Sequence, residues 1–302
     1  MFESQNGRGK ELEAYNLLKA YHIRAMSNAS RDDKISSDRQ WEDATMFFRD
    51  KETKIDILHQ LFKEQLYRTR VWSRGESAFK FTKKQIDEFK GVTLDKETNL
   101  QYAFQNLFLQ QDIANQLMRN MNASVFKIKG RFIHGDSDNI NPFVNINQLI
   151  LNGKSFFEYI ETYVEIYKRL FIQLDSSQLN EFKDFYKKHC LYNGYNWRKG
   201  DLYVREVYKS AIMMVFDRFG EIGVNHIYKE LYMVIYRHRL EKKQVRYDGM
   251  ANSGNIAWIF QTIQNAKNLE QLFPIKQNAV NLKLNINIQY RIEAVINVFT
   301  NY

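Results

Sequence analysis

Apolar residues recur at intervals of three and four along most of this chain, which is the spacing of one face of an α-helix. The clearest stripe lies in SFFEYIETYVEIYKRLFIQL and consists of Phe156, Phe157, Ile160, Val164, Tyr167 and Phe171. A second stripe, in a helix expected over residues 11–26, consists of Ala14, Leu17, Leu18, Tyr21 and Ala25. The same spacing predicts helices over 178–189, 202–219 and 224–241, in NIAWIFQTIQNA, and at the C-terminus. We therefore expect a mainly α, multi-helix globular bundle.

Helix starts are marked by a Ser or Thr followed three residues later by Gln or Glu, because these side chains satisfy the first free backbone N–H groups of a helix. The pairs are Ser37 with Gln40, Thr82 with Gln85, Thr98 with Gln101, and Ser155 with Glu158. The segment FKIKGRFIHGDSDNINPFVNIN is rich in Asn, Asp and Gly and interrupts this pattern. It predicts a long loop or a small β-hairpin near 124–146, and no larger sheet is expected.

Composition agrees with a helical globular protein: 44% of the 302 residues are hydrophobic and only two are proline. The single cysteine, Cys190, excludes an internal disulfide and leaves too few thiols for a structural zinc site, so a reducing, cytoplasmic location is expected. No apolar run approaches the roughly 18 residues needed to cross a bilayer, and the N-terminus lacks the pattern of a signal peptide. Membrane association is not expected.

A net charge of +9 favours acidic partners such as nucleic acid. The basic run YRHRLEKKQVRYDG contains five cations within ten residues: Arg237, Arg239, Lys242, Lys243 and Arg246. Four tyrosines are interleaved with it or precede it, at positions 228, 232, 236 and 247. One interpretation is an exposed patch whose cations contact phosphates and whose tyrosines stack on unpaired bases. The alternative is that the cations complement the helix dipole while tyrosines four residues apart form a packing face.

Three motifs that suggest chemistry are better explained by structure. NGKS at 152–155 resembles the end of a phosphate-binding loop, but Gln148 stands where that loop needs a glycine. HGDSDN at 134–139 lacks the glycine and the glutamate that a calcium loop requires further on. His189 and Cys190 are adjacent, and neighbours on a helix point in different directions. The sequence therefore predicts no catalytic residue and no metal site.

The opening MFESQNGRGKELEAYNLLKAY carries the pattern F-E-x-x-N-x-R-G-x-x-L-x-x-x-x-L-L-K, continued by LLKAYHIRAM. This pattern resembles the last motif of the ParB-like N-terminal domain of GmrSD-type restriction and anti-phage proteins. LILNGKSFFEYIETYVEIY resembles a recurring nGxxFFxYxxxY element of the helical region that follows that domain. The resemblance covers residues 1–27 and 150–167.

The resemblance implies a nucleotide-dependent defence system that recognises and cuts foreign, often modified, DNA. In that family a DGQQR motif is tied to nucleotide use, and an HNH-type nuclease region carries a histidine-rich motif for metal-assisted cleavage. This sequence has no DGQQR and no such histidine motif. The segment most similar to the histidine motif is RHR at 237–239. Catalysis by this chain alone is therefore not expected. The resemblance implies that residues 1–27 are a remnant of the ParB-like domain plus a connecting helix, and 28–302 a helical domain, with a subdivision near 124–150.

By resemblance, Asn6, Arg8 and Gly9 are nucleotide- or phosphate-binding residues. Glycines at 7 and 9 would let the backbone approach a phosphate, and the helix that follows would point its positive end toward it. The alternative is that NGRGKE is only a loop that caps this helix. No cofactor is expected on this chain alone, whereas the intact protein would use a nucleoside triphosphate and a divalent metal.

Two functions remain open at this stage. The first is a DNA-binding or effector-coupling helical module of a restriction system, with DNA and either the ParB-like domain or a nuclease as partners. The second is a protein-interaction or oligomerisation scaffold without nucleic-acid binding. Oligomeric state is left open by the sequence.

Overall fold

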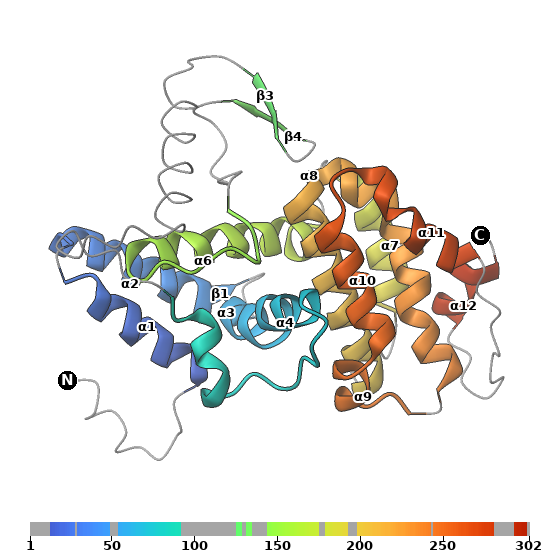
Figure 1. Ribbon diagram of the computed structural model, residues 1–302, viewed down its shortest axis with the longest axis horizontal. Helices are drawn as coiled ribbons and strands as arrows, with labels where there is room; N and C mark the ends of the chain where they lie inside the picture. Colours follow the sequence, from blue (N-terminus) through green and yellow to red (C-terminus); the bar gives the residue numbers. More distant parts are fainter. Residues whose placement is uncertain are drawn as a thin grey trace.

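The structure is a computed structural model. It describes residues 13–27, 29–48, 54–91, 125–128, 131–134, 144–174, 179–192, 198–242, 244–280 and 293–300, with the backbone alone for the two strands between 125 and 134. Helices dominate the molecule, which confirms the predicted mainly α fold class (Figure 1). Within the described residues, strands form two small antiparallel hairpins. One pairs β3 (Val125–Ile128) with β4 (Arg131–His134), which confirms the hairpin predicted near 124–146.

The N-terminal elements form one group of helices with the other small hairpin. They are α1 (Ala14–Ala25), α2 (Arg31–Thr45), β1 (Phe47–Phe48), β2 (Lys54–Ile55), α3 (Ile57–Gln60), η2 (Leu61–Leu66), α4 (Tyr67–Ser73) and η3 (Lys83–Phe89). The run from α3 through η2 to α4 is continuous, with a π-helical middle. The stretch that follows α2 is thus a short hairpin and a separate helix.

The C-terminal elements complete the bundle. They are α6 (Lys154–Tyr167), η4 (Lys168–Ile172), α7 (Asn180–Cys190), α8 (Lys199–Glu241), α9 (Tyr247–Ala251), α10 (Gly254–Asn265), η5 (Leu269–Leu272), α11 (Phe273–Val280) and α12 (Glu293–Thr300). Figure 1 shows α7, α8, α10, α11 and α12 side by side at one end of the molecule, with α6 running back toward α1 and α2. None of the helices among the described residues is both long enough and apolar enough to cross a bilayer.

Helix α8 is a hairpin of two arms, 199–219 and 221–241, because Gly220 has φ +64° and ψ −155°. Only glycine adopts this region readily, so the residue type permits the chain to reverse here. Across the hairpin the Tyr208 hydroxyl donates to the Tyr228 carbonyl at 2.9 Å. The two helices predicted at 202–219 and 224–241 are therefore confirmed.

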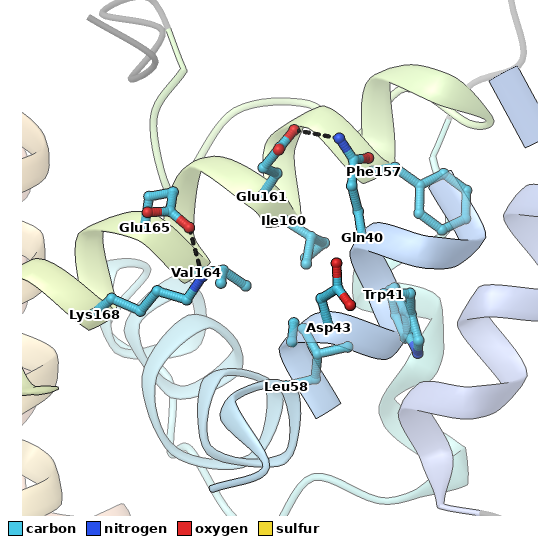
Figure 2. A pocket seen from close by; sticks show the side chains of 11 residues that line it. Gln40, Trp41, Asp43, Leu58, Phe157, Ile160, Glu161, Val164, Glu165 and Lys168 are labelled. Carbon is cyan, nitrogen blue, oxygen red and sulfur yellow. Dashed lines mark hydrogen bonds and ion pairs between the residues drawn. The ribbon is translucent and has the colours of Figure 1, made fainter. Parts of the chain in front are cut away.

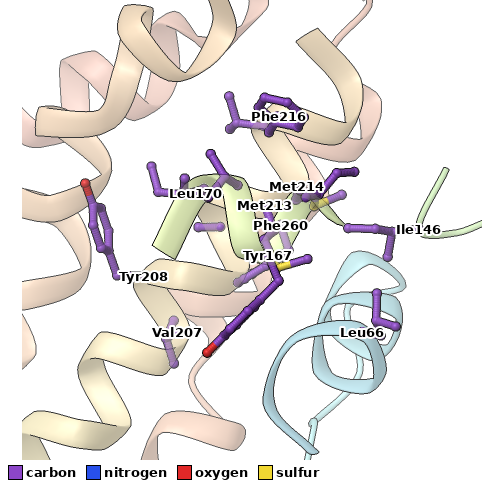
Figure 3. Close-up of a cluster of buried hydrophobic side chains, with 14 of the residues drawn as sticks. Leu66, Ile146, Tyr167, Leu170, Val207, Tyr208, Met213, Met214, Phe216 and Phe260 are labelled. Atoms are coloured by element: carbon purple, nitrogen blue, oxygen red, sulfur yellow. The ribbon is translucent and has the colours of Figure 1, made fainter. Parts of the chain in front are cut away.

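The arms of α8 lie at the centre of the apolar core. Leu66 of η2, Tyr167 of α6 and Val207 of α8 belong to the buried cluster in Figure 3. The cluster extends without a break from Tyr15 in α1 to Val298 in α12. Burial of each such side chain contributes about 1.5–3 kcal/mol, so helices far apart in the sequence share one source of stability.

Several predicted helix starts need correction. Helix α2 begins earlier than predicted, because the Ser30 hydroxyl accepts from the backbone N–H of Asp33 at 3.1 Å and acidic residues occupy the first turn. Ser37 is therefore a buried residue inside the helix. The box at Thr82 is present but heads the 3₁₀ helix η3, and Thr98 lies outside the described residues. Helix α6 begins at Lys154, close to the predicted start, but its N-cap is Gly153, so Ser155 lies inside the helix and does not cap it.

The stripe predicted for α1 is also rotated in the structure. The buried residues are Tyr15, Leu18 and His22, so only Leu18 of the predicted face is buried. Tyr15 and His22 can turn inward because each has a partner: the Tyr15 hydroxyl donates to the Asp56 carboxylate at 2.6 Å, and His22 Nε2 lies 3.0 Å from the Phe89 carbonyl. The stripe predicted for α6 and η4, by contrast, is buried along its whole length.

Candidate nucleic-acid interface

The first turn and the last turn of α8 lie side by side at the open end of the hairpin. Asp201, in the first turn, forms an ion pair with Arg239 on the other arm, and the two side chains are only 1% and 9% exposed. After α8 the chain returns past the start of the first arm. A Cβ placed on Gly200 would lie 3.2 Å from the Val245 carbonyl oxygen, so the absence of a side chain there permits close packing.

A concave surface of about 600 Å³ opens at this end of the hairpin. We call it the basic groove, and it is lined by Arg198, Lys199, Gly200, Asp201, Tyr203, Arg239, Gln244, Val245, Arg246 and Tyr247. Its lining therefore combines two chain segments, the start of α8 and the stretch from the end of α8 into α9.

The rim of the basic groove is positively charged. Arg198, Lys199 and Arg246 are exposed, and within the part of the chain that the structure describes none of them forms an ion pair. Lys242 is exposed at the end of α8. The groove also lies at the N-terminus of α8, where free backbone N–H groups add partial positive charge. The arrangement is suited to binding an anion.

The cations predicted as one exposed patch have different environments. Lys242 and Arg246 are exposed, whereas Arg237 is half-buried with its Nε 3.5 Å from Glu241. The prediction is wrong for Arg239, which is buried against Asp201. Its partner lies 38 positions earlier in the chain, so no neighbouring residue indicated the pairing. Lys243 lies outside the described residues.

The tyrosines divide in the same way. Tyr228, Tyr232 and Tyr236 are buried, and the rings of Tyr232 and Tyr236 stack at 3.9 Å, so the packing interpretation is confirmed for them and base stacking is wrong. Tyr247 instead lines the basic groove, where its ring meets that of Tyr203 edge-on at 5.4 Å. Both rings are partly exposed at the surface of the groove.

A buried arginine lies behind the wall of the groove. The Arg68 guanidinium lies 4.2 Å from the Trp72 ring and 4.6 Å from the Tyr247 ring, and its Nη1 donates to Glu64 at 2.9 Å. Burial is the main reason that the pKa of the Tyr247 hydroxyl is raised, although Arg68 acts in the opposite direction. The Tyr247 ring is therefore held from behind by a cation–π contact.

Sequence reasoning missed Arg198, Lys199 and Tyr203. A signal was available in WRKG at 197–200, where two cations stand at the start of a helix. What it could not reveal is that the hairpin brings these cations beside Arg246.

The remaining sequence candidates form no site among the described residues. Asn6, Arg8 and Gly9 lie outside the described residues. His189 Nδ1 lies 2.6 Å from the Ala294 carbonyl, and burial raises the pKa of the Cys190 thiol to about 12, so the thiol is not activated as a nucleophile. Among the described side chains, no three His, Cys, Asp or Glu groups are placed to hold a metal ion.

Comparison with known proteins gives one match. Residues 33–290 match the model of a family of unknown function (DUF7834). No curated protein and no solved structure shows significant similarity. The similarity of the opening residues to GmrSD proteins therefore stays a prediction.

Proposed function

We propose that this chain, which belongs to the DUF7834 family of unknown function, binds nucleic acid through its basic groove, as the helical portion of a GmrSD-like restriction or defence protein. The observation that carries the binding proposal is the convergence of Arg198, Lys199 and Arg246 on one concave surface. The defence context rests on the resemblance of residues 1–27 and 150–167. The nucleotide and divalent metal implied by that resemblance are assigned to the intact defence protein and not to this groove.

Phosphate is the ligand that this charge distribution favours. Exposed cations without carboxylate partners have no internal ion pair to break when a phosphate arrives, and a concave wall concentrates their field. Arginine side chains can also bind two phosphate oxygens at once. Tyr203 and Tyr247 add an apolar, aromatic surface beside the cations, which suits a strand whose bases are accessible.

The proposal is tested by the salt dependence of nucleic-acid binding. The variant Arg198→Gln/Lys199→Gln/Arg246→Gln removes the three rim cations and leaves the buried pair intact. Its matched control, Lys80→Gln/Lys84→Gln/Lys267→Gln, removes the same charge from exposed positions that do not line the groove. Affinity for single-stranded and duplex DNA is measured by fluorescence anisotropy over a range of salt concentrations.

We expect the groove variant to bind both DNAs more weakly. The slope of log affinity against log salt should fall by about 0.7 for single strands, or about 0.9 for duplex, for each phosphate group that the variant no longer neutralises. The control should keep most of the wild-type slope. Equal affinities and slopes in the two variants would overturn the assignment of binding to the groove, and wild-type protein that binds neither DNA would favour the interaction-scaffold alternative.

A further inference from the structure

A second cavity lies between α2, α3 and α6 (Figure 2). Its volume is about 170 Å³. We call it the acidic pocket, and it is lined by Gln40, Trp41, Asp43, Ala44, Leu58, Phe157, Ile160, Glu161, Val164, Glu165 and Lys168.

The floor of the acidic pocket is apolar. Trp41 and Leu58 come from α2 and α3, and Phe157, Ile160 and Val164 come from α6. All five side chains are nearly inaccessible to solvent. The floor therefore combines aliphatic and aromatic side chains.

The rim carries more negative than positive charge. Figure 2 shows Asp43 on α2 facing α6, which carries Glu161. Lys168 Nζ contacts Glu165 at 2.7 Å, whereas Glu161 accepts only from the neutral amide of Gln40 at 3.0 Å. Among the residues that the structure describes, neither Asp43 nor Glu161 forms an ion pair. A surplus of carboxylates in one pocket is unexpected on a chain with a net charge of +9.

The pKa of the Glu161 carboxyl group responds to charged neighbours along its own helix, among which Lys168 acts to lower it. Partial burial, followed by the negative charges of Glu165 and Glu158, raises the pKa of its carboxyl group. A cation in the pocket would offset the cost of the partly buried negative charge by direct attraction.

We propose that the acidic pocket binds a primary alkylammonium group carried on an unbranched apolar stem. The ammonium lies between Asp43 and Glu161, and the stem packs on Ile160 and Val164. Trp41 and Phe157 add apolar surface beside this stem. An anion is excluded by the carboxylates, and a neutral ligand would desolvate them without compensation. The small volume suits a single flexible chain of this kind and not a bulky ring system.

Two sources can supply this chemistry, a free polyamine and a lysine side chain of another protein. Isothermal titration with 1,4-diaminobutane tests the first source, and titration with Nα-acetyl-lysine methylamide tests the second. 1-Butanol, which has the stem without the charge, serves as the neutral control. Saturable binding of either amine without binding of the alcohol supports the proposal, and the stronger amine identifies the source.

The variant Asp43→Asn/Glu161→Gln removes the two rim charges with little change of shape. Its control, Glu181→Gln/Asp184→Asn, makes the same charge change on exposed residues of α7. We expect the dissociation constant of the bound amine to rise at least about tenfold in the pocket variant and to stay unchanged in the control. Melting temperatures confirm that both variants are folded. The proposal is overturned if neither amine binds wild-type protein at millimolar concentrations, or if both variants weaken binding equally.

Discussion

Asp201 and Arg239 form a buried ion pair that joins the two arms of α8 across 38 positions of sequence. This pair closes the end of the hairpin at which the basic groove opens. It also explains why a basic run that reads as one continuous patch divides into an inward-facing arginine and outward-facing neighbours.

Removing one partner of this pair should strongly destabilise the fold, because the other charge would remain buried without compensation. We expect Arg239→Met to lower the free energy of unfolding by about 3–5 kcal/mol. Urea denaturation measures the loss. The double variant Asp201→Leu/Arg239→Met should lose less than the sum of the two single variants, and additive losses would contradict the assigned coupling.

Replacing Gly220 should strain the reversal between the two arms of α8. Its φ of +64° with ψ of −155° is a conformation that residues with a Cβ rarely adopt. Gly220→Ala should therefore cost about 1–3 kcal/mol, measured by thermal unfolding. The control is Gly249→Ala in α9, where a Cβ would meet no atom within 4 Å and helix propensity favours alanine. Equal effects at the two positions would argue against strain at the reversal.

Stability should decrease in mild acid because His22 is held neutral. Its Nε2 contacts the Phe89 carbonyl at 3.0 Å and its Nδ1 accepts from the Gly153 N–H at 3.3 Å, so a second ring proton would face a donor. Burial lowers the pKa of His22 to about 4.

The unfolded imidazole binds a proton near pH 6.5, and the folded one only near pH 4. The free energy of unfolding should therefore fall as the pH is lowered from about 6.5 to about 4, by about 3 kcal/mol for this group, and His22 should add no pH dependence above that window. Urea titrations at several pH values should show a shallower acid loss for His22→Gln than for wild type. An unchanged slope would show that other groups account for the loss.

The shape of the basic groove should depend on Gly200. A side chain there would press on the Val245 backbone and displace the segment that carries Arg246. We expect Gly200→Val to weaken DNA binding although no charge is removed. Gly254→Val is the control, since a Cβ at that position has open space. If Gly200→Val binds DNA as wild type does while remaining folded, the position of the 244–246 segment does not matter for binding.

Cys190 should be inert in the folded protein. Its side chain is buried, and its pKa is raised to about 12 by that burial, so little thiolate is present or accessible at neutral pH. Iodoacetamide should label it only after denaturation, as measured by mass spectrometry. Rapid labelling of native protein would reopen the idea of a reactive cysteine beside His189.

Much of the helical architecture could be predicted from periodicity. The stripe from Phe156 to Phe171 is buried as expected, because a continuous apolar face is stable only when it packs against other apolar residues. The predicted start of α2 and the predicted buried face of α1 were wrong for a common reason. Polar residues in or next to these helices form hydrogen bonds that the apolar pattern does not reveal. Ser30 caps a neighbouring backbone N–H, whereas Tyr15 and His22 turn inward toward residues 41 and 67 positions away.

Local sequence was sufficient to establish a mainly helical protein with a small hairpin near 124–146, a buried aromatic stripe and a surplus of cations near the end of α8. The folded chain then fixed which of those cations face solvent and which other segments join them. Arg239 was removed from the surface by Asp201, and Arg198 and Lys199 were brought to Arg246 by the reversal at Gly220. Periodicity is a local property of the chain and can be read from neighbouring residues. Charge pairing and groove formation depend on contacts between distant segments, which exist only when the shared core has folded.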